Sequence, residues 1–189
     1  ELYTGLRRGE LLGLRWKDVD MKKGRIKVVQ QLVKEGNNHV IRELKTESSQ
    51  NRIISIPDEV ISVLKEQKAK QEIELKVMGK NDIQIAEYNK TGLIFITEDG
   101  KYVQPRCFDR YFKAILKAAG LQDIRFHDLR HTFALISLQA GADIKTLQND
   151  LGHESIETTL DKYGHVNEEM KRDASNRRSE LLKSVVNKT

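Results

Sequence analysis

Apolar and polar positions alternate with two different periods along this chain of 189 residues. Between residues 24 and 56 the period is two, in the runs RIKVVQQLV, HVIRELK and NRIISI, and clusters of turn-forming residues separate these runs. This segment predicts a three-stranded antiparallel meander. The run LIFIT at 93–97 predicts one more short strand, which a turn at 98–100 ends.

The other periodic segments have the spacing of helices, in which apolar side chains recur every three or four residues. Helices are expected at about 8–15, 58–78, from 105 onward, 127–140, 144–151 and 156–163. Residue types that favour helix ends lie at these boundaries, namely Asp58, Pro105, Asp143, Gly152, Ser155 and Gly164. The pattern therefore predicts an α+β fold that is mainly α-helical, with a small three-stranded antiparallel sheet at one edge.

The helix that begins near 105 has two contrasting faces. Its predicted buried stripe consists of Phe108, Phe112, Ile115 and Ala119. Its opposite stripe is wholly basic and consists of Arg106, Arg110, Lys113 and Lys117. A basic stripe of this kind can lie along the phosphates of DNA, and a solvated helix face has the same pattern. The helix by itself leaves DNA binding open.

Composition narrows the function classes only slightly. Lys and Arg number 33 against 28 acidic residues, a net charge of +5 that mildly favours a polyanionic partner. No apolar run is long enough to span a bilayer, so no membrane partner is expected. Because Cys107 is the single cysteine, an internal disulfide is excluded and a reducing, cytoplasmic location is expected.

The segment RFHDLRHTF at 125–133 concentrates groups that can handle a phosphate. Four of the five histidines fall between 127 and 165. His127 and Arg130 are one helical turn apart and are expected to project from one face, opposite a buried stripe of Leu129, Phe133, Ile136 and Ala140. A guanidinium fits two phosphate oxygens, and an imidazole beside it can donate or shuttle a proton.

A metal site is not expected at this helix. His127 and His131 have the i, i+4 spacing of a zinc pair, but the glutamate of the zinc-protease pattern is missing and Arg130 lies between them. His153 follows a helix stop at Gly152. By periodicity alone, Tyr163 reads as a core aromatic.

Four segments, taken together, resemble the tyrosine recombinase (phage integrase) family in content and order. They are TGLRRGELLGLRW at 4–16, LKTESSQNRIISIP at 44–57, FHDLRHTFA at 126–134 and LGHESIETTLDKYGHV at 151–166. The last two are the most specific and the lysine segment is the weakest. Within the family, the segments KTESSQNR and TTLDKYGHV resemble integrases of Gram-positive phages and conjugative transposons. The resemblance implies six catalytic residues, Arg7, Lys45, His127, Arg130, His153 and Tyr163.

The resemblance also implies a reaction. DNA strands would be cut and rejoined at specific sites through a covalent 3′-phosphotyrosine at Tyr163, with no metal or other cofactor. The implied partners are double-stranded DNA at attachment sites, a tetramer of the protein on that DNA, and accessory DNA-bending or excision factors. Two alternatives stay open: a non-catalytic DNA-binding module with the same fold, and a DNA-relaxing enzyme similar to type IB topoisomerases.

Domain organisation follows from the same resemblance. Residues 1–189 are expected to form one catalytic domain. The apolar periodicity has already begun at Leu2 and Leu6 without a helix cap, so we expect the sequence to start inside a longer protein. The resemblance implies that the missing part is an N-terminal helical domain that clamps the far side of the DNA. The segment 166–189 ends in apolar positions such as Leu181 and Val185, and it is expected to pack on a neighbouring subunit.

Overall fold

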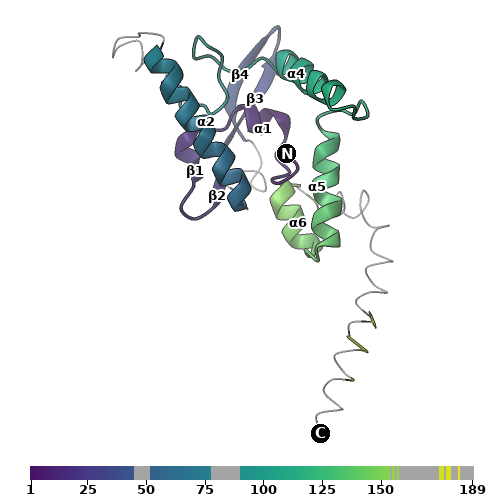
Figure 1. Ribbon diagram of the computed structural model, residues 1–189. Coiled ribbons are helices and arrows are strands. Elements are labelled where there is room, and N and C mark those ends of the chain that lie inside the picture. Colours follow the sequence, from purple (N-terminus) through teal and green to yellow (C-terminus); the bar gives the residue numbers. More distant parts are fainter. Residues whose placement is uncertain are drawn as a thin grey trace.

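The structure is a computed structural model that describes residues 1–44, 52–77 and 90–153, together with residues 155, 157, 175, 176, 178, 179 and 183. The elements of these residues follow in the order α1 (Arg8–Leu12), the 3₁₀ helix η1 (Trp16–Asp18), β1 (Val19–Asp20), β2 (Arg25–Val28), β3 (Gln30–Glu35), β4 (Asn38–Glu43), β5 (Arg52–Ser55), α2 (Asp58–Val77), α4 (Pro105–Ala118), α5 (Asp128–Gln139) and α6 (Ile144–Leu151) (Figure 1). The predicted α+β class with a small antiparallel sheet is confirmed.

The three-stranded sheet is antiparallel and has the order β1-β2-β5. Ile26 of β2 lies opposite Ile54 of β5, and Val28 lies opposite Arg52. Alternate residues of both strands are buried, so one face of the sheet contributes to the hydrophobic core. Arg52 lies on the same buried face of β5 as Ile54, so its guanidinium is inside the protein.

The predicted meander is wrong in its connectivity. The sequence predicts one strand over 25–33, whereas β2 ends at Val28 and β3 begins at Gln30, to pair with β4 in a separate two-stranded ribbon. Even-numbered positions are buried on both sides of the break, so the periodicity continues across it. The strand is interrupted because its two halves pair with different strands. β2 pairs with β5, which follows the hairpin of β3 and β4 in the sequence.

The helix α1 packs closely against the backbone of β3. A Cβ atom at Gly9 would lie 2.6 Å from the carbonyl oxygen of Leu32, so a larger residue would force the backbone apart. The buried Gln30 donates from Nε2 to the carbonyl oxygen of Gly13 at 2.7 Å. These contacts fix α1, and with it the segment that leads into α1, relative to the ribbon.

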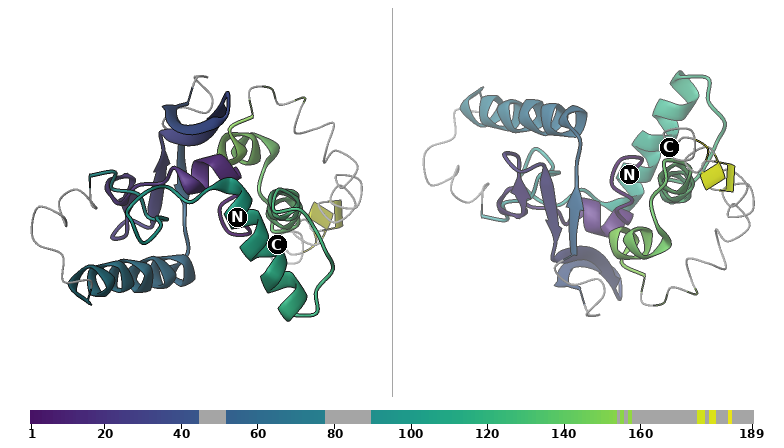
Figure 2. Two further views of the ribbon diagram at one scale, coloured as in Figure 1. Left: turned by 90° about the horizontal axis from the view of Figure 1, so that it is seen from above. Right: turned by 90° about the horizontal axis from the view of Figure 1, so that it is seen from below.

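Two hydrophobic clusters form the core of the part of the chain that the structure describes. In the first, Ile61 and Leu64 of α2 pack with the inward residues of the three-stranded sheet. The second joins α5 to α6 through Ala134, Leu138, Leu147 and Leu151. Figure 2 shows α2 on one side of the molecule and α4, α5 and α6 gathered on the other. None of the helices in the described part of the chain is both long enough and apolar enough to cross a bilayer.

The bounds of α2, α5 and α6 agree closely with the predicted ones, whereas α1 ends at Leu12 rather than at about 15. Asp58 begins α2 as its first helical residue rather than as its cap, and Pro105 stands in the first turn of α4. Asp143 caps α6, since its carboxylate accepts from the backbone N–H of Thr146 at 2.9 Å. At 93–97, by contrast, the predicted strand is wrong: Leu93 and Ile96 form only isolated bridges, to Arg15 and Tyr102.

The buried faces of α4 and α5 differ from the predicted ones. On α5 the buried residues are Arg130, Ala134 and Leu138, and Ile136 of the predicted stripe is 53% exposed. On α4, Ile115 is 65% exposed while its neighbour Leu116 is buried. The α5 prediction fails because a periodicity counts every arginine as polar, whereas Arg130 lies inside the protein.

Two further predictions fall largely on residues that the structure does not describe. Of the helix predicted at 156–163, only residue 157 is described, and the backbone N–H of Glu157 donates to Ser155 Oγ at 3.0 Å. Of the segment 166–189, only residues 175, 176, 178, 179 and 183 are described.

Candidate active site

Arg7 stands at the N-cap of α1, where its backbone is extended. Its backbone N–H donates to Glu10 Oε2 at 2.8 Å, and its Nη1 donates to Glu10 Oε1 at 2.9 Å. Its Nη2 donates to the carbonyl oxygen of Gly152 at 3.1 Å. Because 35% of the side chain is exposed, Arg7 is anchored by the protein and still reaches solvent.

Glu10 and Arg52 are two buried residues that sequence reasoning missed. Arg52 donates from Nη2 to Glu10 Oε2 at 2.6 Å and from Nη1 to Glu10 Oε1 at 3.1 Å. Burial acts to raise the pKa of the Glu10 carboxyl, but the hydrogen bond and charge of Arg52, together with Arg7, outweigh it and lower that pKa. Glu10 is therefore a carboxylate shared by two guanidiniums.

Each missed residue has a signal in the sequence. Glu10 is the third residue after the N-cap at Arg7, the position from which a glutamate side chain returns to the N-cap backbone. Arg52 occupies an inward position of the alternating run RIISI. An arginine on the buried phase of a strand requires internal acceptors, because a buried charge without partners is strongly destabilising.

Arg130 is 2% exposed and belongs to α5. It donates from Nη1 to the carbonyl oxygen of Gly5 and from Nη2 to the carbonyl oxygen of Leu151. An arginine does not lose its proton in a protein, so Arg130 carries a full positive charge among these carbonyl dipoles. Arg130 thereby ties the segment before α1 to the end of α6.

Gly152 ends α6 in the left-handed conformation, with φ 60° and ψ 46°. A Cβ atom there would lie 3.0 Å from Arg52 Nη1, so the guanidinium packs directly on the glycine. Arg52 also donates from Nε to the carbonyl oxygen of Asp150 at 3.1 Å. Arg52 and its partner Glu10 therefore brace the turn that ends α6.

This turn is where three of the predicted catalytic residues meet. The carbonyl oxygens of Leu151 and Gly152 accept from Arg130 and Arg7, and the next residue is His153. His153 is 9% exposed. Its backbone carbonyl accepts from the Nε2 of Gln148 at 3.1 Å, and its backbone N–H donates to the Gln148 carbonyl at 3.1 Å.

His127 is the N-cap of α5, and it is exposed. Its ring centroid is 5.3 Å from that of His131, with the two planes nearly perpendicular. Arg130 is buried and His127 is exposed, and that the two project from one helix face stays a prediction. Lys45 and Tyr163 lie outside the residues that the structure describes.

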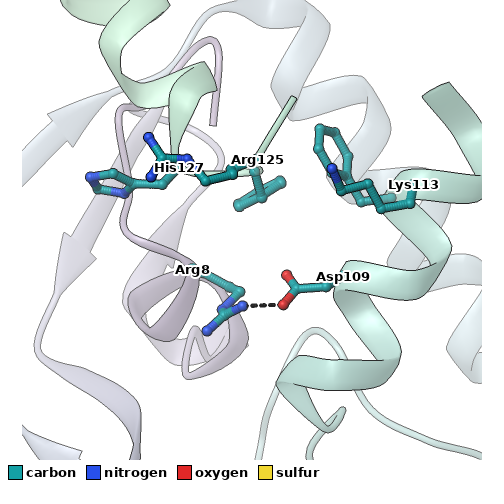
Figure 3. Close-up of a pocket in the computed structure, with 7 residues that line it drawn as sticks. Arg8, Asp109, Lys113, Arg125 and His127 are labelled. Carbon is teal, nitrogen blue, oxygen red and sulfur yellow. Dashed lines mark hydrogen bonds and ion pairs between the residues drawn. The ribbon is translucent and has the colours of Figure 1, made fainter. Parts of the chain in front are cut away.

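A pocket of about 450 Å³ opens beside His127, between α1, α4 and the segment that leads into α5 (Figure 3). Its lining residues are Arg8, Asp109, Phe112, Lys113, Arg125, Phe126 and His127. Of the four basic residues predicted on α4, Lys113 lines this pocket, while Arg106, Arg110 and Lys117 are exposed on the same helix. Basic groups thus extend from the rim of the candidate site along α4.

Comparison with known proteins places the chain in a family. The model of the phage integrase family matches residues 1–170. The chain therefore belongs to this family, the tyrosine recombinases, and the resemblance seen in its four motifs is confirmed.

Two relatives illustrate the similarity. The tyrosine recombinase XerC-like protein of Caldanaerobacter subterraneus subsp. tengcongensis is 33% identical over 183 residues, which cover 90% of this chain and 45% of the relative. The ICEBs1 integrase of Bacillus subtilis is 31% identical over 182 residues, which cover 95% of this chain and 46% of the relative. The chain thus spans about half the length of the curated relatives it matches.

Solved structures show the same fold. The Tn1549 transposon integrase in complex with transposon right end DNA is 26% identical, with a TM-score of 0.67 over 92% of this chain and 56% of that one. The XerA recombinase is 27% identical, with a TM-score of 0.63 over 94% of this chain and 54% of that one.

Proposed function

We propose that this chain cuts and rejoins DNA strands at specific sites through a covalent 3′-phosphotyrosine at Tyr163. The observation that carries the proposal is the anchoring of Arg7 and Arg130 on adjacent carbonyls, immediately before His153. Attack on a phosphodiester builds negative charge on the nonbridging oxygens. Cations that are already fixed in place stabilise that charge with little reorganisation.

In the proposed step, the phenolic oxygen of Tyr163 attacks phosphorus and the bond from phosphorus to the 5′-oxygen breaks. A phenol has a pKa of about 10, so its proton must be removed, and we assign this role to His127. Lys45 gives a proton to the leaving 5′-oxygen. The nonbridging oxygens are held by Arg7, Arg130 and His153. Because side chains supply the positive charge, the proposed reaction requires no metal ion and no other cofactor.

The proposed substrate is double-stranded DNA at attachment sites. The similar integrase structure that contains transposon right end DNA supports this choice. The basic residues Arg106, Arg110, Lys113 and Lys117 of α4 are proposed to contact the backbone. We further propose that residues 1–189 form the catalytic domain, that the protein acts in the cytoplasm as a tetramer on DNA with accessory factors, and that the segment 166–189 packs on a neighbouring subunit.

A covalent adduct assay tests the proposal. DNA fragments from the region around the gene, nicked so that the cleaved end is lost, are expected to give a denaturant-resistant adduct with the wild-type chain, with or without a chelator. Tyr163→Phe is expected to bind the same DNA and form no adduct, because the ring is kept and the nucleophile is lost.

The outcomes separate the alternatives. An undiminished adduct in Tyr163→Phe would contradict the assignment of the nucleophile. DNA binding without an adduct in the wild type would indicate a non-catalytic module. Relaxation of supercoiled DNA without paired sites would indicate an enzyme of the topoisomerase type.

A further inference from the structure

Three cations around the pocket beside His127 each pair with an aspartate. The pairs are Arg8–Asp109, Lys113–Asp123 and Arg125–Asp128. Each of these six side chains keeps at least 31% of its surface exposed. All three pairs therefore stand in contact with solvent, where ion pairs are weak and screened by salt.

The cations converge on one opening from three separate elements. Arg8 comes from α1, Lys113 from α4, and Arg125 from the segment before α5, and Figure 3 shows them around the same space. Phe112 and Phe126 also line the opening, and the Phe126 ring packs edge-on against Phe108 and Phe112, at centroid distances of 4.6 Å and 5.2 Å. A lining that combines aromatic rings with cations fits a backbone phosphate and its sugar.

We propose that this pocket is a second phosphate-binding subsite for the DNA backbone, in which Arg8, Lys113 and Arg125 exchange their aspartate partners for phosphate oxygens. The subsite rests on the proposed function, since it takes the same DNA as its ligand. DNA phosphates compete well for these cations because each phosphate contact also releases a condensed counterion. The aspartate carboxylates repel DNA phosphates, and only DNA that reaches the three cations gains contacts that offset this repulsion. The pocket therefore favours DNA that is bound beside His127.

The ion pair Arg8–Asp109 joins α1 to α4, and substituting its two members should change DNA affinity in opposite directions. Arg8→Gln is expected to weaken binding of a short duplex and to reduce the slope of log affinity against log salt by about 0.9, the value of one phosphate contact. Asp109→Asn is expected to bind the same duplex about threefold tighter or more, because Arg8 keeps its charge and loses its competitor. The measurement is fluorescence anisotropy across a salt series, with melting temperatures recorded for both variants.

The opposing interpretation is a structural tie between α1 and α4. A tie predicts that both substitutions lower the melting temperature and weaken binding together, and that result would overturn the proposal. The exposed pair Lys70–Glu74 on α2 provides matched controls. Lys70→Gln and Glu74→Gln make the same charge changes as Arg8→Gln and Asp109→Asn. If they change DNA affinity as much, net charge alone explains the effect, and the proposal is overturned.

Neutral methylphosphonates placed one at a time along the duplex locate the phosphate. At one position the losses from the methylphosphonate and from Arg8→Gln should not add, because both remove the same contact. Full additivity at every position would refute the subsite. A free anion is tested by adding inorganic phosphate at constant ionic strength and following the His127 ring signals by NMR. Shifts there, with no effect of Asp109→Asn on DNA, would make the pocket a free-anion site.

The adduct assay keeps this proposal separate from the proposed function. An adduct formed by the wild-type chain, with no opposite-sign effect of the two substitutions, would reject the subsite and leave the recombinase activity standing. The opposite-sign effect without any adduct would support the DNA subsite and reject the activity.

Discussion

The cationic side chains of this domain occupy two contrasting environments. At the end of α6, Arg52 and Arg130 are buried, and their acceptors are backbone carbonyls and the buried carboxylate of Glu10. In the pocket beside α4, Arg8 and Lys113 are partly exposed, and their acceptors are aspartate side chains at the surface.

The difference shows how burial decides what a cation can do. A backbone carbonyl at a helix end cannot move away, and a buried carboxylate cannot be replaced by water or salt, so the cations at α6 stay fixed in place. Exposed carboxylates are screened and mobile, so the cations they hold can change partners. The first environment suits charge stabilisation at a reacting phosphate, and the second suits reversible contact with DNA.

The largest expected effect comes from making one substitution in both environments. Arg130→Lys is expected to slow single-turnover adduct formation by about 100-fold or more, because an ammonium cannot span the two carbonyls that the planar guanidinium reaches. Arg8→Lys is expected to lose far less, because a flexible ammonium follows a mobile partner. The control is circular dichroism, which should show that both variants fold. Equal losses would break the comparison.

A smaller effect is expected on stability. Glu10→Gln should lower the free energy of unfolding by about 3 kcal/mol, because Arg52 is left buried without its full countercharge. The pKa of Glu10 is lowered in the folded protein, so its contribution is present above the ordinary value of 4.5 and is lost as the pH falls through the folded value. The free energy of unfolding, measured with urea at several pH values, should therefore decrease less steeply in acid for Glu10→Gln than for the wild type.

Asp109→Asn is the matched control for that measurement, since it makes the same change in the exposed environment. Its stability is expected to stay close to that of the wild type throughout the pH series. A loss comparable to that of Glu10→Gln would mean that the pocket pair is as structural as the buried one.

The smallest effect isolates the contact between Arg52 and Gly152. Gly152 and Gly120 have φ values of 60° and 65°, and only at Gly152 would a Cβ meet a neighbour, Arg52 Nη1 at 3.0 Å. Each substitution to Ala is expected to cost about 1 kcal/mol for the left-handed conformation. Gly152→Ala should cost more and also slow adduct formation, because its carbonyl holds Arg7. Equal unfolding energies would show that Arg52 yields without cost.

By itself the sequence determined the local features of this protein. Period and end signals located α2 and α6 with almost their observed bounds and the start of α4, because Pro105 and Asp143 act on the backbone within one turn of themselves. The four motif segments indicated the family that the comparison confirms over residues 1–170. They also marked Arg7, Arg130 and His153, which the structure brings to one turn.

Only the tertiary structure decided which partners these residues have. Glu10 and Arg52 are 42 positions apart, and Arg130 and Gly5 are 125 apart. A local pattern of polar and apolar residues cannot show either contact, because it compares only neighbouring positions. The same limit hid the break between β2 and β3 and the buried face of α5. A periodicity records whether a side chain is polar, whereas burial of a charge depends on acceptors that distant segments supply.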